Sequence, residues 1–489
     1  MSMYRRPSLG SASSRLAPHH DILFWTSLVA LIFAIKAAFV LFDRLPIFYL
    51  GDSAVYLSSA ISDSMPDDRS FTYGLFFIRP ILALFGSLGA VVVAQSLVSG
   101  ASCILAGMCL RVGFDAPPWV VAVTAITYAF EPLALTQERL ILTETVALFF
   151  LALFVLVGLV YIRQPRWYLV VLLALIGAVA LSLRTSFIPM IVIATAAVVL
   201  LGAPRLWQEL RAGKKFLPVF LLHAVLAVGA TAGFHAAYKQ YFSYMTGSPP
   251  SYNAGGGFFL VAAWAPIISQ VDFPNERVAN LILPNVKYEL SRRSNRSVNR
   301  FWPDGLVGVI IKAENGNYLF AQKLAGKIAR NAALRDPLGV ANLAWETYTD
   351  FWDREIMNKR LVKEQGDREL SDYLLKYFNE HYDEDLSGHH LQSSLVKQWH
   401  VSAFYWYRFL LLSPLLSLLT IVTAGSYRSS SIFIGVVVCA LMVVNCALGT
   451  EAVIRYLQPV AWLTCLQLGQ VLCAVPTLWR RPALVSAAS

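Results

Sequence analysis

The stretch Leu142-Thr-Glu-Thr-Val-Ala-Leu-Phe-Phe-Leu-Ala-Leu-Phe-Val-Leu-Val-Gly-Leu-Val-Tyr161 carries one charged residue, Glu144, close to its start. A helix needs roughly 20 apolar residues to cross a bilayer core about 30 Å thick. The stretch therefore predicts a membrane-spanning helix with Glu144 near one membrane surface. With similar apolar runs elsewhere, the sequence predicts about ten spans: residues 22–42, 89–110, 118–136, 142–161, 167–183, 187–203, 216–235, 403–424, 431–449 and 454–475.

The composition of the whole chain agrees with this pattern. Of its 489 residues, 57% are hydrophobic and 14% are charged, whereas an ordinary soluble chain is roughly 45–50% apolar and about 25% charged. The composition thus indicates the bilayer as the solvent. We predict an all-α polytopic membrane protein with about ten transmembrane helices and an inserted, mainly helical extramembrane domain.

The formal net charge of +10 is explained by membrane topology and does not indicate a nucleic-acid partner. If the N-terminus is cytoplasmic, every predicted inside connection carries Lys or Arg, as Arg111, Arg163 and Arg428 illustrate. This excess of basic residues on the cytoplasmic side is the usual determinant of orientation. We therefore predict a multi-pass protein of the bacterial inner membrane with both termini in the cytoplasm.

The predicted spans divide the chain into four parts. Residues 1–21 form a cytoplasmic arm, residues 22–235 a transmembrane module, and residues 403–489 the last helices with a short cytoplasmic tail. Residues 236–402 contain 19 Lys and Arg against 18 Asp and Glu, which is the composition of a soluble domain. We therefore predict that this insert lies outside the membrane, on the periplasmic or lumenal side.

The first outer loop, residues 43–88, is polar at first and apolar from Phe76 to Phe85. Arg79-Pro80 interrupts the apolar part, since proline lacks the N–H that the interior of a helix needs. We therefore predict a helix that lies at the membrane interface and does not cross it.

Polar residues near the outer ends of the spans are the candidates for function, because charges are costly in apolar surroundings. They come from connections far apart in the sequence, yet all are predicted at one depth. Together they predict an outer polar cavity suited to a lipid-linked substrate. The candidates are Asp52, Tyr56, Arg79, Glu138, Glu144, Arg184, Glu451, Arg455 and Tyr456.

Several of these candidates also have a simpler interpretation. Asp52 is suited to act as a general base for an acceptor hydroxyl or amine, but it could equally cap the next helix. Arg184 and Arg455 offer forked donors for a phosphate. The simpler alternatives are an anchor at the lipid headgroups for Arg184 and a local pair with Glu451 for Arg455. The two glutamates before the fourth span could be solvated loop residues.

Five elements of the candidate region share one order and one predicted side of the membrane. They are Gly51-Asp52-Ser53-Ala-Val-Tyr56, Tyr73-Gly-Leu-Phe-Phe-Ile-Arg79-Pro80, Gln137-Glu138-Arg139 with Thr143-Glu144, Leu183-Arg184-Thr-Ser-Phe-Ile-Pro189, and Glu451-Ala-Val-Ile-Arg455-Tyr456-Leu-Gln-Pro459. This arrangement resembles the GT-C superfamily of membrane glycosyltransferases, and most of all its protein O-mannosyltransferase and lipid A aminoarabinose-transferase group. The resemblance covers residues 20–235 and, more loosely, 403–475, but not the insert.

The resemblance implies an inverting transfer of a sugar from a polyprenyl-phosphate donor to a glycan, lipid or protein acceptor at the outer face. It implies that Arg184 and Arg455 hold the phosphate, that Asp52 accepts the proton of the acceptor, and that the lipid tail lies between spans. The family often has two neighbouring acids in the first loop, where this chain has Asp52 followed by Ser53. No cofactor is therefore assigned, and a divalent metal is the one candidate.

Three other functions fit the same residues. A flippase or transporter of lipid-linked saccharides predicts ionisable residues at mid-membrane, for which Lys36, His223 and His235 are the hints. A polysaccharide polymerase or ligase would use similar arginines to join larger glycans. A non-catalytic scaffold would bind a partner through its outer domain.

Overall fold

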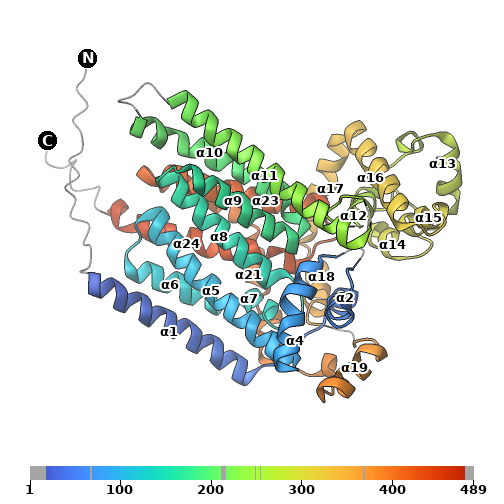
Figure 1. The fold of residues 1–489 in the computed structure, drawn as a ribbon, viewed down its shortest axis with the longest axis horizontal. Coiled ribbons are helices and arrows are strands. Elements are labelled where there is room, and N and C mark those ends of the chain that lie inside the picture. The colour runs from blue at the N-terminus through green and yellow to red at the C-terminus, as the bar shows by residue number, and fades with distance from the viewer. Residues whose placement is uncertain are drawn as a thin grey trace.

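A computed structural model describes residues 18–66, 69–210, 216–247, 249–253, 255–366 and 369–479. Throughout these residues the regular elements are helices, and the β-type pairing is an isolated bridge between Ile47 and Leu140. Long helices run side by side, and a group of shorter helices lies at one end of the bundle (Figure 1).

Seven helices of the described chain are long and apolar enough to cross a membrane. An eighth crossing is made if α21 (Phe404–Leu410) and α22 (Ser413–Thr423) form one span bent by 54°. The chain is therefore an all-α, multi-pass integral membrane protein, as predicted. The seven helices are α1 (Pro18–Phe42), α5 (Leu88–Phe114), α8 (Glu144–Arg163), α10 (Ile188–Leu210), α11 (Phe216–Thr246), α23 (Arg428–Leu448) and α24 (Gln458–Trp479).

The predicted span 118–136 is not one helix. It is divided into α6 (Pro118–Ala129) and α7 (Pro132–Gln137), because a proline at the first position of a helix starts a new element. The Glu131 side chain caps α7 by accepting an N–H bond from its first turn. Both helices are too short to cross a membrane alone.

The helix α9 has the predicted bounds, Trp167–Leu183, but it is only 17 residues long. It packs against α8 and α11, just as α6 packs against α5 and α24. In the described part of the chain, the full-length spans thus number seven or eight instead of about ten. The shorter helices lie against the longer ones.

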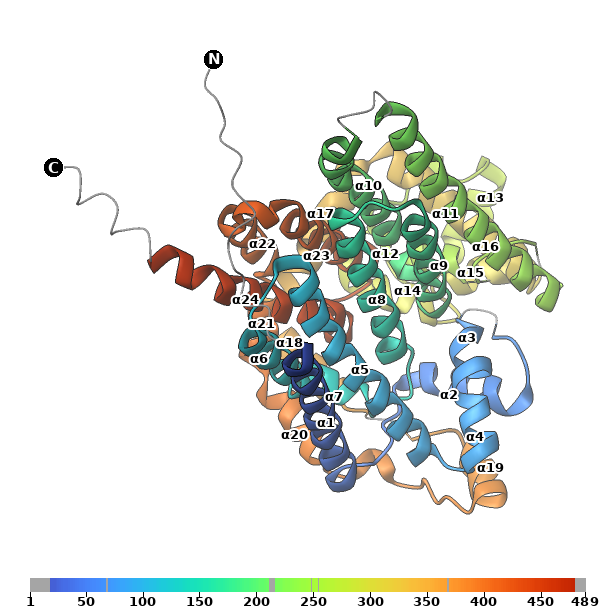
Figure 2. The ribbon, with the colours of Figure 1, turned by 60° about the vertical axis from the view of Figure 1, so that its left-hand side comes forward.

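The two ends of the bundle differ in what they carry. The start of α1 and the end of α24 lie at one end, and helices α12 to α19 lie at the other (Figures 1 and 2). The insert and these two helix ends thus lie at opposite ends of the bundle, and a topology with both termini on one side of the membrane remains a prediction. Which end faces the cytoplasm is likewise a prediction.

The first outer loop contains α2 (Leu50–Ser62) and a second apolar helix from Phe71 to Phe85. The second helix is not broken at Arg79-Pro80. A π-helical turn precedes the proline, and such a turn is a known way for a helix to accommodate a local defect in its hydrogen bonding. Three large apolar side chains are exposed on this helix: Phe76, Leu84 and Phe85. Their exposure suits a helix at the membrane interface, which remains the prediction for this segment.

The insert consists of two parts with different cores. Its first part, residues 255–335, has a hydrophobic core of its own, whereas the buried hydrophobic side chains between 351 and 386 belong to the main core of the membrane bundle. The insert is thus partly fused to the bundle. Its helices are α12 (Gly256–Ala263), α13 (Glu276–Ile282), α14 (Arg296–Phe301), α15 (Leu306–Ala313), α16 (Tyr318–Arg335), α17 (Pro337–Asp350), α18 (Arg354–Lys363), α19 (Asp372–Tyr382) and α20 (Leu395–Ser402).

A fully buried ion pair joins α1 to the segment after α7. The Lys36 ammonium pairs with Glu138, whose other oxygen accepts from Arg139 Nη1 at 2.7 Å and from Ser96 Oγ at 3.0 Å. Next to this pair, the backbone of Ile47 bonds to residues 139 and 141. The network therefore fixes the segment that leads to α2 against the segment that leads to α8.

We predict that Lys36→Met lowers the stability of the protein by about 3 kcal/mol. Removing one partner of a buried ion pair costs roughly 3–5 kcal/mol, and Arg139 still neutralises Glu138 in this variant. Thermal unfolding in detergent measures the effect. Lys359→Met is the control, because it breaks a pair whose partners are 74% and 78% exposed and such pairs contribute about 0–1 kcal/mol. Equal losses in both variants would contradict the structural role of Lys36.

Candidate functional site

Eight charged side chains gather where the membrane bundle meets the insert, and we call them the ion cluster. They come from α2, from the loop after it, from the start of α8, from the end of α9, from α18, and from the segment between α23 and α24. Four of them are basic and four are acidic. The residues are Asp52, Arg69, Glu144, Arg184, Arg360, Glu364, Glu451 and Arg455.

Asp52 is held by two guanidinium groups. Its Oδ1 accepts from Arg69 Nη2 at 2.7 Å, and its Oδ2 accepts from Arg455 Nη2 at 2.8 Å. The side chain makes no helix cap, since α2 has Tyr49 at its N-cap without a side-chain bond. Burial disfavours the carboxylate, but the two positive charges outweigh it and hold the pKa of Asp52 well below its usual range.

Arg455 does not pair with Glu451. The backbone between α23 and the 3-10 turn Ile454–Leu457 is not helical, so the i, i+4 spacing does not bring the two side chains together. Arg455 instead bonds to Asp52, lies 3.6 Å from a Glu144 oxygen, and stacks on the ring of Tyr49 at 4.0 Å. The local-pair interpretation of Arg455 is therefore wrong in this structure.

Arg184 also points into the cluster. Its Nη1 lies 3.6 Å from the same Glu144 oxygen, its Nε bonds to Ser186, and its guanidinium lies 4.6 Å from the centre of the Tyr456 ring. The side chain is 10% exposed. Glu144 thus stands between Arg184 and Arg455, and Tyr456 covers the arginines from one side.

Three buried guanidinium N–H groups of the cluster have no hydrogen-bond partner among the described residues. They belong to Arg184 Nη1, Arg360 Nη1 and Arg455 Nε. A buried donor left without an acceptor costs about 1–3 kcal/mol, and native structures usually avoid this. The arrangement therefore suits a ligand that brings its own acceptor oxygens. Phosphate is such a ligand, and arginine is the residue whose geometry matches it best.

Three predicted site residues lie apart from the ion pairs of the cluster. Tyr56 is buried one turn after Asp52 and packs edge-on against Tyr73, at 5.2 Å between ring centres. Arg79 pairs with Asp63 at an exposed position, and Glu138 belongs to the buried Lys36 network. The sequence predicted all three beside Asp52 in one outer cavity.

The structure adds three residues that the sequence interpretation did not single out: Arg69, Arg360 and Glu364. Arg360 pairs with Glu451. Glu364 is buried and accepts the backbone N–H of Ile454 at 2.9 Å and that of Arg455 at 2.7 Å. The i, i+4 spacing of Arg360 and Glu364 was the available signal, but the charge-rich insert contains many such pairs.

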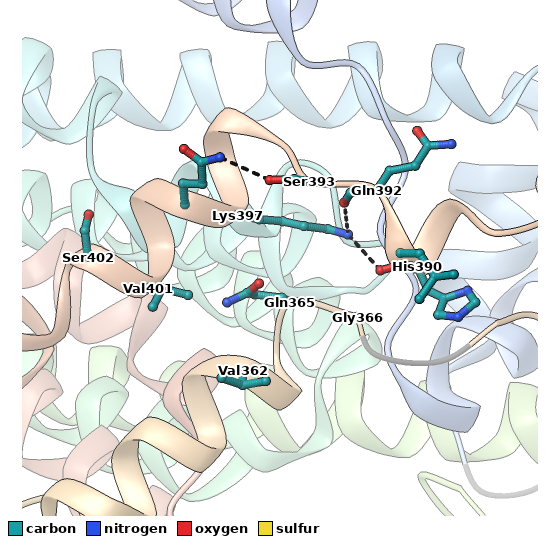
Figure 3. Close-up of a pocket in the computed structure, with 11 residues that line it drawn as sticks. Val362, Gln365, Gly366, His390, Gln392, Ser393, Lys397, Val401 and Ser402 are labelled. Atoms are coloured by element: carbon teal, nitrogen blue, oxygen red, sulfur yellow. Dashed lines mark hydrogen bonds between the residues drawn. The ribbon is translucent and has the colours of Figure 1, made fainter.

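A hollow of about 710 Å³ lies beside α18. Gln365, which follows Glu364 in the chain, lines one wall, and residues between 390 and 402 line the other (Figure 3). The Lys397 ammonium is engaged by the carbonyl oxygens of His390 and Gln392. The hollow is therefore walled mainly by amide, hydroxyl and aliphatic groups, and none of the eight cluster residues lines it.

The residues described by the structure contain no group of three or more His, Cys, Asp or Glu side chains arranged to hold a metal ion. The acids of the cluster face guanidinium groups or backbone N–H groups instead. The candidate cofactor from the sequence, a divalent metal, therefore finds no ligand set among these residues.

The chain matches no protein-family model, and no curated protein matches it. Among solved structures it is similar to the crystal structure of ArnT from Cupriavidus metallidurans bound to undecaprenyl phosphate. The sequence identity is 13%, the TM-score is 0.30, and the match covers 89% of this chain and 78% of that one.

We predict that Glu364 makes stability depend on pH. Burial raises the pKa of Glu364 to about 7, although Arg455 and the two N–H bonds oppose the shift. The folded protein binds the Glu364 proton more tightly than the unfolded chain does. The contribution of Glu364 to the free energy of unfolding is therefore complete below about pH 4.5 and is lost as the pH rises through 7. One pKa unit corresponds to about 1.4 kcal/mol, so the loss is of the order of 3 kcal/mol.

The measurement is the melting temperature in detergent between pH 5 and pH 8. Wild type should lose stability over this range relative to Glu364→Gln, whose side chain cannot ionise. Glu355→Gln changes an exposed glutamate of the same helix and should follow the wild-type curve. A Glu364→Gln curve parallel to wild type would show that Glu364 does not titrate in this range.

Proposed function

We propose that the protein transfers a sugar from a polyprenyl-phosphate donor to an acceptor, at the membrane face that carries the insert. One observation carries the proposal. A carboxylate, Asp52, is bonded to the guanidinium of Arg455, in a cluster that contains three buried guanidinium nitrogens without a hydrogen-bond partner among the described residues. Such a site combines a proton acceptor with donors for a phosphate leaving group.

Arg184 and Arg455 are the proposed phosphate ligands. Both stack on Tyr456, and both lie 3.6 Å from Glu144. Glu144 would keep the two guanidinium groups next to each other, and Tyr456 would limit their movement. Charge develops on the phosphate as it leaves, so positioned cations stabilise the transition state more than the ground state. The lipid tail would lie against the apolar spans.

Asp52 is the proposed general base. The acceptor oxygen or nitrogen attacks the anomeric carbon, its proton passes to the Asp52 carboxylate, and the bond from that carbon to the phosphate oxygen breaks. Polyprenyl phosphate leaves with the bonding electrons, and the configuration at the anomeric carbon is inverted. The low pKa of Asp52 makes it a weak base while both arginines hold it. A donor phosphate that competes for Arg455 would raise its basicity.

The other predicted ligands keep subsidiary roles. Glu451 would hold Arg360 through their ion pair. Tyr56 lies one turn from Asp52 with its pKa raised by burial, so its phenol stays neutral and can act as a hydrogen-bond donor. Binding roles for Arg79 and Glu138 remain predictions from the resemblance, since both are engaged elsewhere.

Transport of lipid-linked saccharides has less support. Lys36 is engaged by Glu138, His223 bonds to Tyr161 at 2.8 Å, and His235 bonds to Tyr252 at 2.6 Å. Each of the three hints is thus accounted for by a local contact. A polymerase or ligase of larger glycans would use the same arginines, and the size of the accepted glycan separates it from the transfer of single sugars.

We predict that Asp52→Asn lowers the turnover of sugar transfer about 100-fold or more, in keeping with the usual effect of a general base. The assay uses purified protein in detergent, radiolabelled polyprenyl-phosphate sugars, and a membrane extract as the pool of acceptors. Asp304→Asn removes an exposed acid of the insert and should retain the wild-type rate.

Two outcomes would contradict this account. Transfer at the wild-type rate by a folded Asp52→Asn protein would remove Asp52 as the base. Absence of transfer by wild type with every donor, together with retained binding of labelled lipid, would favour the flippase or scaffold alternative.

A further inference from the structure

Helix α18 belongs to the insert, yet two of its side chains reach the ion cluster. Arg360 and Glu364 lie one turn apart, and both point toward the turn that carries Arg455. α18 also contacts α20, α21 and this turn. We propose that Arg360 is a third phosphate-binding guanidinium of the donor site, and that Glu364 positions it next to Arg455. This proposal rests on the function proposed above.

The contacts of Arg360 leave one donor unused. Its side chain is only 12% exposed, and its Nη2 pairs with Glu451. Its Nη1 is buried without a hydrogen-bond partner among the described residues. A purely structural ion pair would leave this N–H uncompensated in the folded protein, at a cost in stability. An acceptor oxygen of a bound phosphate would satisfy it, because a guanidinium can bind a carboxylate and a phosphate with different N–H groups at once.

Glu364 sets the position of α18 relative to Arg455. Each of its two carboxylate oxygens accepts one backbone N–H, from Ile454 and from Arg455. These bonds fasten the end of α18 to the turn on which Arg455 stands. The charged and titratable groups that face Glu364 are Arg360, Arg455, Tyr49 and Tyr407. Arg360 and Arg455 thus belong to one connected unit, although they are 95 positions apart in the sequence.

The electrostatics of the cluster favour the same interpretation. Burial lowers the pKa of Arg360, the charges of Tyr49, Glu364 and Tyr456 oppose this shift, and the nearby charge of Arg455 adds to it. Two guanidiniums at close range repel each other, and an anion between them removes the repulsion. The carboxylate of Glu451 compensates Arg360 from one side only. The unused donors of Arg360 and Arg455, which are Nη1 and Nε, remain for an added anion.

The proposal gives the insert a direct part in donor binding. An independent outer domain that only recognises the acceptor would not supply phosphate ligands. Here the second part of the insert shares its core with the membrane bundle, so α18 is held rigidly enough to place a side chain. Donor affinity should therefore depend on a residue of the insert as well as on the arginines next to the spans.

The experiment measures the affinity of the full-length protein in detergent for two probes, polyprenyl phosphate and inorganic phosphate. Arg360→Gln should weaken both about 10- to 100-fold, which corresponds to the loss of a hydrogen bond to a charged group. Arg335→Gln, which breaks the pair with Asp272 elsewhere in the insert, should bind both probes like wild type. Arg360→Lys keeps a charge for Glu451 but loses the fork, so its affinity should fall while its unliganded melting temperature stays near wild type.

Failure of the Arg360 proposal and failure of the proposed function would give different results. Wild-type affinity of Arg360→Gln for polyprenyl phosphate would overturn the role of Arg360 and leave the proposed function intact. The role of Arg360 would also be overturned if Arg360→Lys kept both the wild-type affinity and the wild-type melting temperature. It would be overturned as well if Arg360→Gln lost affinity for polyprenyl phosphate but not for inorganic phosphate. A wild-type protein that binds neither probe would overturn the proposed function itself. Equal losses for both probes, with an unchanged Arg335→Gln control, would support a contact between Arg360 and the phosphate.

Discussion

The organisation of this protein depends on the cost of burying charge. Asp52 and Arg455 are 403 positions apart in the chain, and they meet at 2.8 Å. Neither group could be buried alone, since an unpaired ion in a low-dielectric region loses several kcal/mol of solvation. The first outer loop and the last span must therefore come together. Every segment that adds a charge to the cluster is constrained in the same way.

Two buried polar networks hold distant segments of the chain together. One contains Lys36 and Glu138, and the other contains Asp52 and Arg455. Gln95 connects the first network to the outer loop, because its amide donates to the carbonyl oxygens of Glu138 and Leu140 while its oxygen accepts from Tyr73. The segments that lead to Asp52 and to Glu144 are thus fixed before a substrate arrives. Such preorganisation is what electrostatic stabilisation of a transition state requires.

The sequence predicted the membrane architecture well, because apolar runs report directly on the bilayer. It also predicted that Asp52, Glu144, Arg184 and Arg455 come together, since all four follow or precede spans on one side. It failed where local chemistry overrides periodicity. Pro132 divides a predicted span. The simpler alternative for Arg455, a local pair with Glu451, is excluded by the non-helical backbone after α23.

The part that α18 plays could not be found from the sequence. Arg360 and Glu364 lie in a segment rich in both charges, where most acids and bases are solvated. Only the fold distinguishes them, because α18 is pressed against the turn of Arg455 while its exposed face carries Glu355 and Lys359. A pattern of charges along one helix does not reveal which face will be buried by a segment 90 residues away.

The most direct test of the central claim is an experimental structure of the full-length protein with polyprenyl phosphate bound, determined by cryo-electron microscopy. The account predicts that the phosphate lies within hydrogen-bond distance of Arg184 and Arg455, and next to Asp52. A phosphate bound elsewhere, with the pairs of Asp52 and Glu144 unchanged, would contradict the assignment of the ion cluster as the donor site.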